Sequence, residues 1–257
     1  MSGDLIAISG SCTNTVEVYR RVDGVWRHEA TLTRPAWAPN PEYYFYFGDS
    51  VDVQGDHIVV GDSAAGDNLN GAVFVYSYRN RQWVEGARLQ AYDGAIGNGF
   101  GFAVSLCDDQ LAVGAPGTSE HGWHSGSVYL YRWVAVSEDV DRSVTPKPTG
   151  AWLFTQKLTS FNTYTAAQFG SELGLTGSVL VAGRSANPFN TEDPWAFMYT
   201  RAGPTWVNKT VLSERGDSFP KSVSVDGNFA HSKPKFTLSA SYIRYVTLRC
   251  YRPAFQG

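Results

Sequence analysis

Apolar and polar positions alternate along this chain in short runs that turn residues separate. The segment 49–89 shows the pattern clearly, with apolar-rich runs at 49–53, 57–61, 72–78 and 82–89. Gln54-Gly55-Asp56 and Asn80-Arg81 stand between runs and are residues that favour tight turns. The run at 72–78 is apolar on both faces, which is typical of a strand covered on both sides. The pattern predicts a four-stranded antiparallel sheet.

Three markers recur along the chain in a constant order. Phe-Gly, or Phe-Pro in the last case, opens units at positions 47, 100, 169 and 219. An apolar run ending in Tyr lies at 16–19, 73–76, 128–131 and 196–199, and a tryptophan follows at 26, 83, 152 and 206. We expect these tryptophans to pack inside the blades. Four-stranded units that cannot bury both faces alone stack radially. The sequence therefore predicts an all-β fold, a β-propeller of four-stranded antiparallel blades.

The markers place units at about 1–46, 47–99, 100–168 and 169–218, with a partial unit from 219. On this division residues 1–227 form the propeller, and 228–257 form a divergent tail. The first unit lacks a Phe-Gly strand, and 219–225 reads as a first strand, so pairing of 219–225 with 5–8 would close the ring at four blades. Strands at 236–244 and 245–252 would instead make a fifth, partial blade. Four to five blades are expected.

Composition narrows the function classes. The 257 residues carry a net charge of −3, which disfavours a nucleic-acid platform because such a surface is basic. No apolar run is long enough for a transmembrane helix, and we expect no signal peptide within the sequence, whose first residues read as a strand. The wide spacing of Cys12, Cys107 and Cys250 fits no metal motif. They are either buried thiols, or Cys12 and Cys250 form a disulfide that leaves Cys107 free.

The units resemble the FG-GAP repeat, the blade of integrin-α-like β-propellers. The resemblance rests on Phe100-Gly101, on Val113-Gly114-Ala115-Pro116 and on the run 126–131, and the second unit repeats it in Phe47-Gly48 and in 71–76. It covers roughly residues 1–227. The resemblance implies an extracellular, cell-surface or organelle-lumen protein used for binding, cell adhesion or scaffolding.

The same resemblance raises the question of calcium, because family members commonly carry Ca²⁺ in blade loops of the form Asp-x-Asp-x-Asp-Gly. Here only the loop 62–70 offers an oxygen set, made by Asp62, Asp67, Asn68 and Asn70. Hard cations take six to eight oxygen ligands, and this loop lacks the spaced carboxylates. We expect no cofactor, with Ca²⁺ at Asp62, Asp67 and Asn68 as the alternative.

Two segments are candidates for partner contact. The loop of the third unit gathers Glu120, His121, Trp123 and His124, which read either as a solvent-facing loop or as a contact site. The segment 35–46 is rich in aromatics, among them Trp37, Tyr43 and Tyr44. Those rings either plug the space between blades or present an aromatic surface to a protein or a sugar.

Signs of catalysis are missing from the sequence. It contains no Gly-x-Ser-x-Gly elbow, phosphate loop or His-Glu-x-x-His motif, and Asp108-Asp109 reads as a turn. Asn208-Lys209-Thr210 is a glycosylation sequon on a predicted outer strand, so Asn208 could carry a glycan in the secretory pathway.

The sequence thus favours a non-enzymatic propeller that holds a protein partner, or a glycan, through its blade loops. Two alternatives stay open: a structural subunit of a larger multiprotein assembly, and a lectin. Neither a nucleic-acid partner nor a membrane span is expected.

Overall fold

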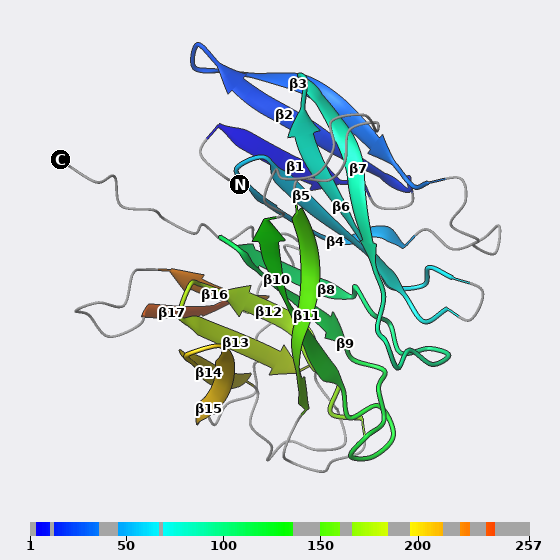
Figure 1. The fold of residues 1–257 in the computed structure, drawn as a ribbon, viewed down its shortest axis with the longest axis vertical. Coiled ribbons are helices and arrows are strands. Elements are labelled where there is room, and N and C mark those ends of the chain that lie inside the picture. The colour runs from blue at the N-terminus through cyan, green and yellow to red at the C-terminus, as the bar shows by residue number, and fades with distance from the viewer. Residues whose placement is uncertain are drawn as a thin grey trace.

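The protein is an all-β molecule in the computed structural model (Figure 1). The structure describes residues 4–10, 13–35, 46–66, 69–135, 150–159, 166–184, 196–212, 222–226 and 235–239. Their regular elements are seventeen β-strands, and these described residues contain no helix. The predicted all-β class is confirmed.

The strands form five antiparallel sheets, four of which we call blades 1 to 4. Blade 1 has three strands, and blades 2, 3 and 4 have four each in chain order. Blade 1 comprises β1 (Leu5–Ser9), β2 (Thr15–Val22) and β3 (Val25–Thr33); blade 2 comprises β4 (Phe47–Gln54), β5 (His57–Asp62), β6 (Ala72–Arg79) and β7 (Gln82–Leu89). Blade 3 comprises β8 (Ala103–Cys107), β9 (Gln110–Ala115), β10 (Ser127–Ala135) and β11 (Gly150–Thr159); blade 4 comprises β12 (Phe169–Leu175), β13 (Val179–Arg184), β14 (Ala196–Ala202) and β15 (Thr205–Leu212). The fifth sheet pairs β16 (Ser222–Asp226) with β17 (Lys235–Ser239).

Tight turns join neighbouring strands where the sequence predicted them. Asn80 and Arg81 both have positive φ, 51° and 63°, between β6 and β7, as a two-residue hairpin of the primed type requires. Asp108 has φ 53° between β8 and β9, which confirms the predicted turn at Asp108-Asp109. These turns bring consecutive strands into antiparallel register, so each blade is a meander.

The blades follow one another in chain order. The first strand of each four-stranded blade contacts that of the next, from β4 through β8 to β12, while β1 contacts β4 at one end and β16 contacts β12 at the other (Figure 1). Among the described strands β1 pairs only with β2, and β16 pairs only with β17. The predicted pairing of 219–225 with 5–8 is therefore wrong for Ser222–Val225. The alternative of a fifth, partial blade with strands at 236–244 and 245–252 is met only by β17, because residues 240–257 lie outside the described residues. Among the described strands none pairs the sheet of β16 and β17 with blade 1, and we call this arrangement the open arc.

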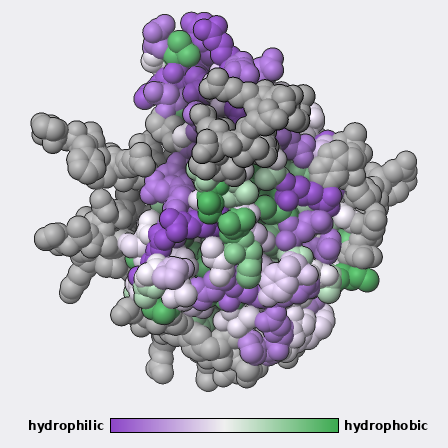
Figure 2. All heavy atoms as spheres, in the orientation of Figure 1, coloured by the Kyte–Doolittle hydropathy of each residue, from purple (hydrophilic) through white to green (hydrophobic). Residues whose placement is uncertain are grey.

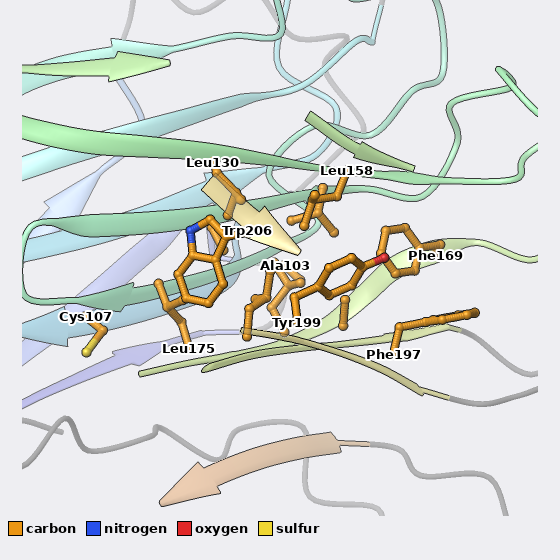
Figure 3. Close-up of a cluster of buried hydrophobic side chains, with 14 residues drawn as sticks. Ala103, Cys107, Leu130, Leu158, Phe169, Leu175, Phe197, Tyr199 and Trp206 are labelled. Atoms are coloured by element: carbon orange, nitrogen blue, oxygen red, sulfur yellow. The ribbon is translucent and has the colours of Figure 1, made fainter. Parts of the chain in front are cut away.

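The hydrophobic core lies between successive blades. One cluster of buried side chains joins blades 1 and 2, a second joins blades 2 and 3, and a third joins blades 3 and 4. In the third cluster Phe169, Phe197, Tyr199 and Trp206 of blade 4 face Leu130 and Leu158 of blade 3 (Figure 3). Blades 2 and 3 thus bury one face against the blade before and the other against the blade after, as stacked repeats require.

The repeated tryptophans pack between blades in blades 2 to 4. Trp152 and Trp206 are buried, and the indole N–H of Trp83 donates to Glu29 of blade 1 at 2.9 Å. Trp26 differs, because it is 38% exposed. The predicted structural packing holds for Trp83, Trp152 and Trp206, but they pack between blades rather than inside each blade. For Trp26 the prediction is wrong. No described blade precedes blade 1 and covers Trp26.

Phe-Gly forms the joint between blades. The Phe100 ring lies on Tyr129 of its own blade at 5.3 Å between centroids, and the Phe100 N–H donates to Asn70 O of blade 2 at 3.0 Å. A Cβ on Gly61 would lie 1.9 Å from Gly101 O, and one on Gly71 would lie 2.0 Å from Phe100 O. Backbone meets backbone here, so only glycine fits. The same contacts recur between Phe169-Gly170 and the glycines of blade 3.

Side chains of the first strands add a second link between blades. The buried Asp52 carboxylate accepts the Leu106 N–H of blade 3 at 2.8 Å and the Val53 N–H of its own strand at 2.8 Å. One blade further on, Ser105 Oγ accepts the Leu175 N–H at 3.1 Å. Burial raises the pKa of Asp52 to about 6, although both backbone hydrogen bonds lower it.

Cys107 is disulfide-bonded in this structure. The expectation that Cys107 is free, whether as a buried thiol or beside a Cys12–Cys250 bridge, is therefore wrong. Cys12 and Cys250 lie outside the described residues.

Candidate binding groove

The loop of blade 3, residues 117–126, is held in one conformation by its own hydrogen bonds. Gly126 N–H donates to Thr118 O at 2.9 Å, and the Thr118 and Ser127 hydroxyls are 2.6 Å apart. Ser119 Oγ accepts the His124 N–H at 3.0 Å, and Ser125 Oγ accepts the His121 N–H at 3.2 Å. Hydrogen bonds of serine and threonine side chains thus hold this polar segment in place of the backbone pairing of a regular strand.

The same loop is fastened to its surroundings on two sides. Trp123 O accepts the Ala166 N–H at 2.6 Å, and His124 O accepts the Gln168 N–H at 2.8 Å, just before blade 4 begins. On the other side Gly117 N–H donates to Asn98 O at 3.0 Å, in the linker 90–99 between blades 2 and 3. The loop is therefore a rigid element that spans from the linker to blade 4.

Between the linker and the loop lies a groove of about 370 Å³. Its size falls within the range of small-molecule sites. One wall comes from the linker, the other from the loop, and β11 contributes Lys157. The lining residues are Asp93, Ala95, Ile96, Asn98, Gly117, Thr118, Ser119, Glu120, Trp123, His124 and Lys157. We call this the linker–loop groove.

Lys157 bridges the two carboxylates of the groove, Asp93 and Glu120. Its Nζ donates to Asp93 Oδ2 at 2.6 Å and also to Glu120, and it lies 4.9 Å from the centre of the Tyr129 ring. The Lys157 side chain is only 10% exposed. Tyr129 Oη donates to Asp93 Oδ1 at 2.7 Å. Partial burial raises the pKa of Asp93, but the hydrogen bonds from Lys157 and Tyr129 outweigh it and hold that pKa below its ordinary value. Asp93 is thus a carboxylate with both oxygens engaged.

Trp123 supplies the aromatic surface. It is 62% exposed, and its indole stacks on the His124 ring with 3.9 Å between centroids and 15° between planes. His121 turns instead toward β11, where its Nε2 lies 3.1 Å from Thr159 Oγ1. The two histidines therefore do not converge. No group of three or more metal-binding side chains occurs in the part of the chain that the structure describes.

An apolar patch adjoins the groove. Tyr92 packs on Phe154 of β11 at 5.0 Å between centroids and on Tyr129 at 6.2 Å, and Tyr129 also lies under Lys157. Tyr92 and Phe154 are both exposed. Figure 2 shows hydrophobic side chains gathered at the centre of one face, over β10 and β11.

Asp62, a predicted calcium ligand, is fully buried in a different arrangement. Its Oδ2 accepts Arg34 Nε of blade 1 at 2.5 Å, and the two side chains are 0% and 11% exposed. Burial raises the pKa of Asp62, while the Arg34 guanidinium lowers it. A cation at Asp62 would have to displace Arg34. Asp67 and Asn68 lie outside the described residues.

The other predicted site residues are placed only in part. Trp37, Tyr43 and Tyr44 lie outside the described residues, as does most of the insertion after β10. Asn208 lies in β15, the last strand of blade 4, opposite Tyr199. The predicted outer-strand position of the sequon is thus confirmed, whereas its glycosylation stays a prediction.

Sequence reasoning missed the linker wall and Lys157. Asp93, Ile96 and Asn98 lie between the predicted strands of two units, and Lys157 stands in an ordinary outer strand. No local motif marks them, because blade stacking brings together residues that are far apart in the sequence. The stacking of Trp123 on His124 could not be read from the sequence. The two residues stood out there only as part of a cluster of ionisable and aromatic side chains.

Stacked antiparallel sheets of this kind define a β-propeller type of repeat protein. The family model of the FG-GAP repeat matches residues 26–76 and 83–131. The chain therefore carries FG-GAP repeats, as in integrin-α-like propellers, and the predicted resemblance is confirmed. Each match runs from the last strand of one blade to the third strand of the next, so it includes a blade joint.

A search of curated proteins found no match to this chain. FG-GAP propellers are generally non-enzymatic, often serve protein–protein interaction, and typically occur in extracellular proteins. Within the described residues, no helix has the length and apolar character needed to cross a membrane.

Proposed function

We propose that this chain is a non-enzymatic binding propeller that holds a protein partner at the linker–loop groove and the adjoining apolar patch. The observation that carries the proposal is the exposed Trp123 on a loop fixed from both sides. Aromatic side chains that stay exposed on a rigid support are the usual anchors of protein interfaces. Because the loop is already ordered, binding costs little conformational entropy.

Two further features support a contact surface here. The apolar patch of Tyr92 and Phe154 lies beside the polar groove, which matches the mixture of apolar and polar area found in interfaces. The ionisable groups of the groove engage one another, since Lys157 bridges Asp93 and Glu120. Such an arrangement suits recognition better than proton transfer. An extracellular or lumenal location is part of the proposal and rests on the family.

Site-specific crosslinking tests the proposal. A photoreactive benzoylphenylalanine replaces Trp123 in one variant and Trp26, the exposed tryptophan of blade 1, in a matched control. The captured protein is then purified, and its binding to the wild type, Trp123→Ala and Trp26→Ala is measured by calorimetry. We expect capture through position 123 and binding about tenfold weaker for Trp123→Ala. Equal capture at both positions, or unchanged affinity of Trp123→Ala, would contradict the proposal, as would hydrolytic turnover that loop substitutions abolish.

A second candidate function is that of a structural subunit, and the outer face of blade 1 favours it. Ile8 and Trp26 are exposed there at 49% and 38%, although the equivalent positions in the other blades are buried or, at Trp83, partly buried. Exposed apolar groups of this size mark interaction surfaces. Size-exclusion chromatography with light scattering distinguishes the two functions, because a stable monomer across concentrations favours the independent binding module.

A further inference from the structure

The linker–loop groove has a chemical character that narrows what it can hold. The lining presents the indole of Trp123 together with polar groups of both kinds. Asp93 and Glu120 are acceptors, Lys157 is a donor, and Asn98 is both. The groove therefore combines an aromatic ring surface with several hydrogen-bond donors and acceptors.

Charge excludes two ligand classes. An anionic group would meet two carboxylates, and the one ammonium beside them, Lys157, is 10% exposed and already bonded to both. A cationic group would have to compete with Lys157 for the same carboxylates. Separating such a partly buried pair leaves a charge uncompensated, which is costly. A neutral ligand meets neither penalty.

Hydroxyl groups are neutral and can hydrogen-bond to both the carboxylates and the ammonium of the groove. A hydroxyl donates to a carboxylate and accepts from an ammonium or an amide at the same time, so it can join the Asp93–Lys157–Glu120 set without breaking it. The Trp123 indole, backed by His124 at 3.9 Å, needs an apolar surface against its open face. A ring with one apolar face and a rim of hydroxyls satisfies both walls.

We infer that the groove holds a neutral saccharide ring, with one face on Trp123 and its hydroxyls toward Asp93, Glu120 and Lys157. This inference rests on the proposed function, because it names the part of the partner that the groove recognises, a neutral glycan. The fixed geometry of the walls supports it. Gly117 N–H binds Asn98 O at 3.0 Å, and a Cβ on Gly117 would lie 2.0 Å from Gly97 O, so linker and loop are locked together.

An array of neutral, sialylated and sulfated oligosaccharides tests the inference with the full chain. We expect binding to at least one class of neutral glycan and a loss of about tenfold or more for Trp123→Ala. Glu120→Gln keeps the size of the side chain but removes its charge from Lys157, and we expect weaker binding from it too. Trp26→Ala, which removes an exposed indole elsewhere, should bind like the wild type. Thermal melting checks that all variants are folded.

Three results would overturn the inference: no neutral glycan bound, neutral glycans bound equally by Trp123→Ala, or binding confined to sialylated and sulfated glycans. A crosslinked protein that needs Trp123 but binds equally after enzymatic removal of its glycans would also overturn it, while the proposed function would stand. Neutral glycans that need Trp123, with no protein captured at position 123, would overturn the protein-binding proposal and support the saccharide site.

Discussion

Blade 1 and the blades after it use the same strand pairing but end in different surfaces. Ile8 pairs with Glu17 in blade 1 as Val60 pairs with Phe74 in blade 2. At this position blades 2, 3 and 4 carry Phe74, Tyr129 and Phe197, each in contact with the Phe of the Phe-Gly pair. Blade 1 has no such Phe among its described residues. Its Glu17 instead binds the His28 ring and the Thr31 hydroxyl, both at 2.7 Å.

The joint between blades 1 and 2 is also less tightly packed than the joints between the later blades. A Cβ on Gly101 or Gly170 would lie 2.5 or 2.6 Å from a carbonyl of the preceding blade, whereas one on Gly48 would lie 3.7 Å from Thr15 O. Ser9 stands in blade 1 where blades 2 and 3 have Gly61 and Gly114, and it holds the backbones apart.

Three features therefore occur together at the joints that connect blades 2, 3 and 4: the Phe-Gly pair, the two glycines of the preceding blade, and the aromatic residue of the third strand. Blade 1 has no Phe-Gly strand among its described residues, and there a charged residue, Glu17, stands in place of the aromatic. Blade 1 thus differs from blades 2 to 4 on the face that no described blade covers.

The largest effect on stability should come from exchanging the aromatic and the charged residue between Phe74 of blade 2 and Glu17 of blade 1. Phe74→Glu places a carboxylate in a fully buried site against Phe47, and we expect it to lower the free energy of unfolding by more than about 4 kcal/mol. The reciprocal Glu17→Phe lies on an exposed face, so we expect a change within about 0.5 kcal/mol. Urea unfolding measures both. Similar losses from the two changes would show that blade 1 is covered like the others.

The glycine contacts should give the next largest effect. Gly114→Ala would put a methyl group 1.9 Å from Gly170 O, so blades 3 and 4 must move apart. We expect a loss of about 3 kcal/mol. Gly86→Ala is the matched control, since its Cβ would meet nothing closer than 3.5 Å. The midpoint of denaturant unfolding should fall for Gly114→Ala alone, and a tolerated Gly114→Ala would mean that the joint is loose.

A smaller effect should depend on pH. Burial raises the pKa of Asp52 to about 6 from its ordinary value of 3.8, so between these values the folded chain binds a proton that the unfolded chain does not. This contribution to stability is full below pH 3.8 and is lost as pH rises through 6. The unfolding free energy of the wild type, relative to Asp52→Asn, should therefore grow by about 3 kcal/mol from pH 7.5 to 3.5. A constant difference between the two proteins would show that Asp52 is not buried at the blade joint.

Much of the fold was predictable because it is local and repeated. Alternation, turn residues and Phe-Gly mark each strand of blades 2 to 4, and the repeat shows which strands are equivalent. The end of the array was not predictable in this way. Glu17 replaces the aromatic residue that Phe74 provides in blade 2, but the sequence alone does not show that this face of blade 1 is uncovered. The pattern of 219–225 fits a strand that closes the ring as well as a strand of a fifth sheet.

The site was predictable only on its loop side. Trp123 and His124 stood out as a cluster, but their partners across the groove, Asp93 and Lys157, are joined to them only by the stacking of blades. Asp62 could be read only as a carboxylate in a blade loop, because its partner Arg34 comes from the blade before and no local motif links the two.

The most direct test of the open arc is which strand lies beside β16. In the structure Val223 is opposite Leu238 of β17, and residues opposite one another across antiparallel strands have neighbouring side chains. In a methyl-labelled sample the account predicts nuclear Overhauser contacts between Val223 and Leu238, and none between Val223 or Val225 and Leu5 or Ile8. Contacts of Val223 and Val225 with Leu5 and Ile8 would mean that the ring closes on blade 1, and would contradict the account.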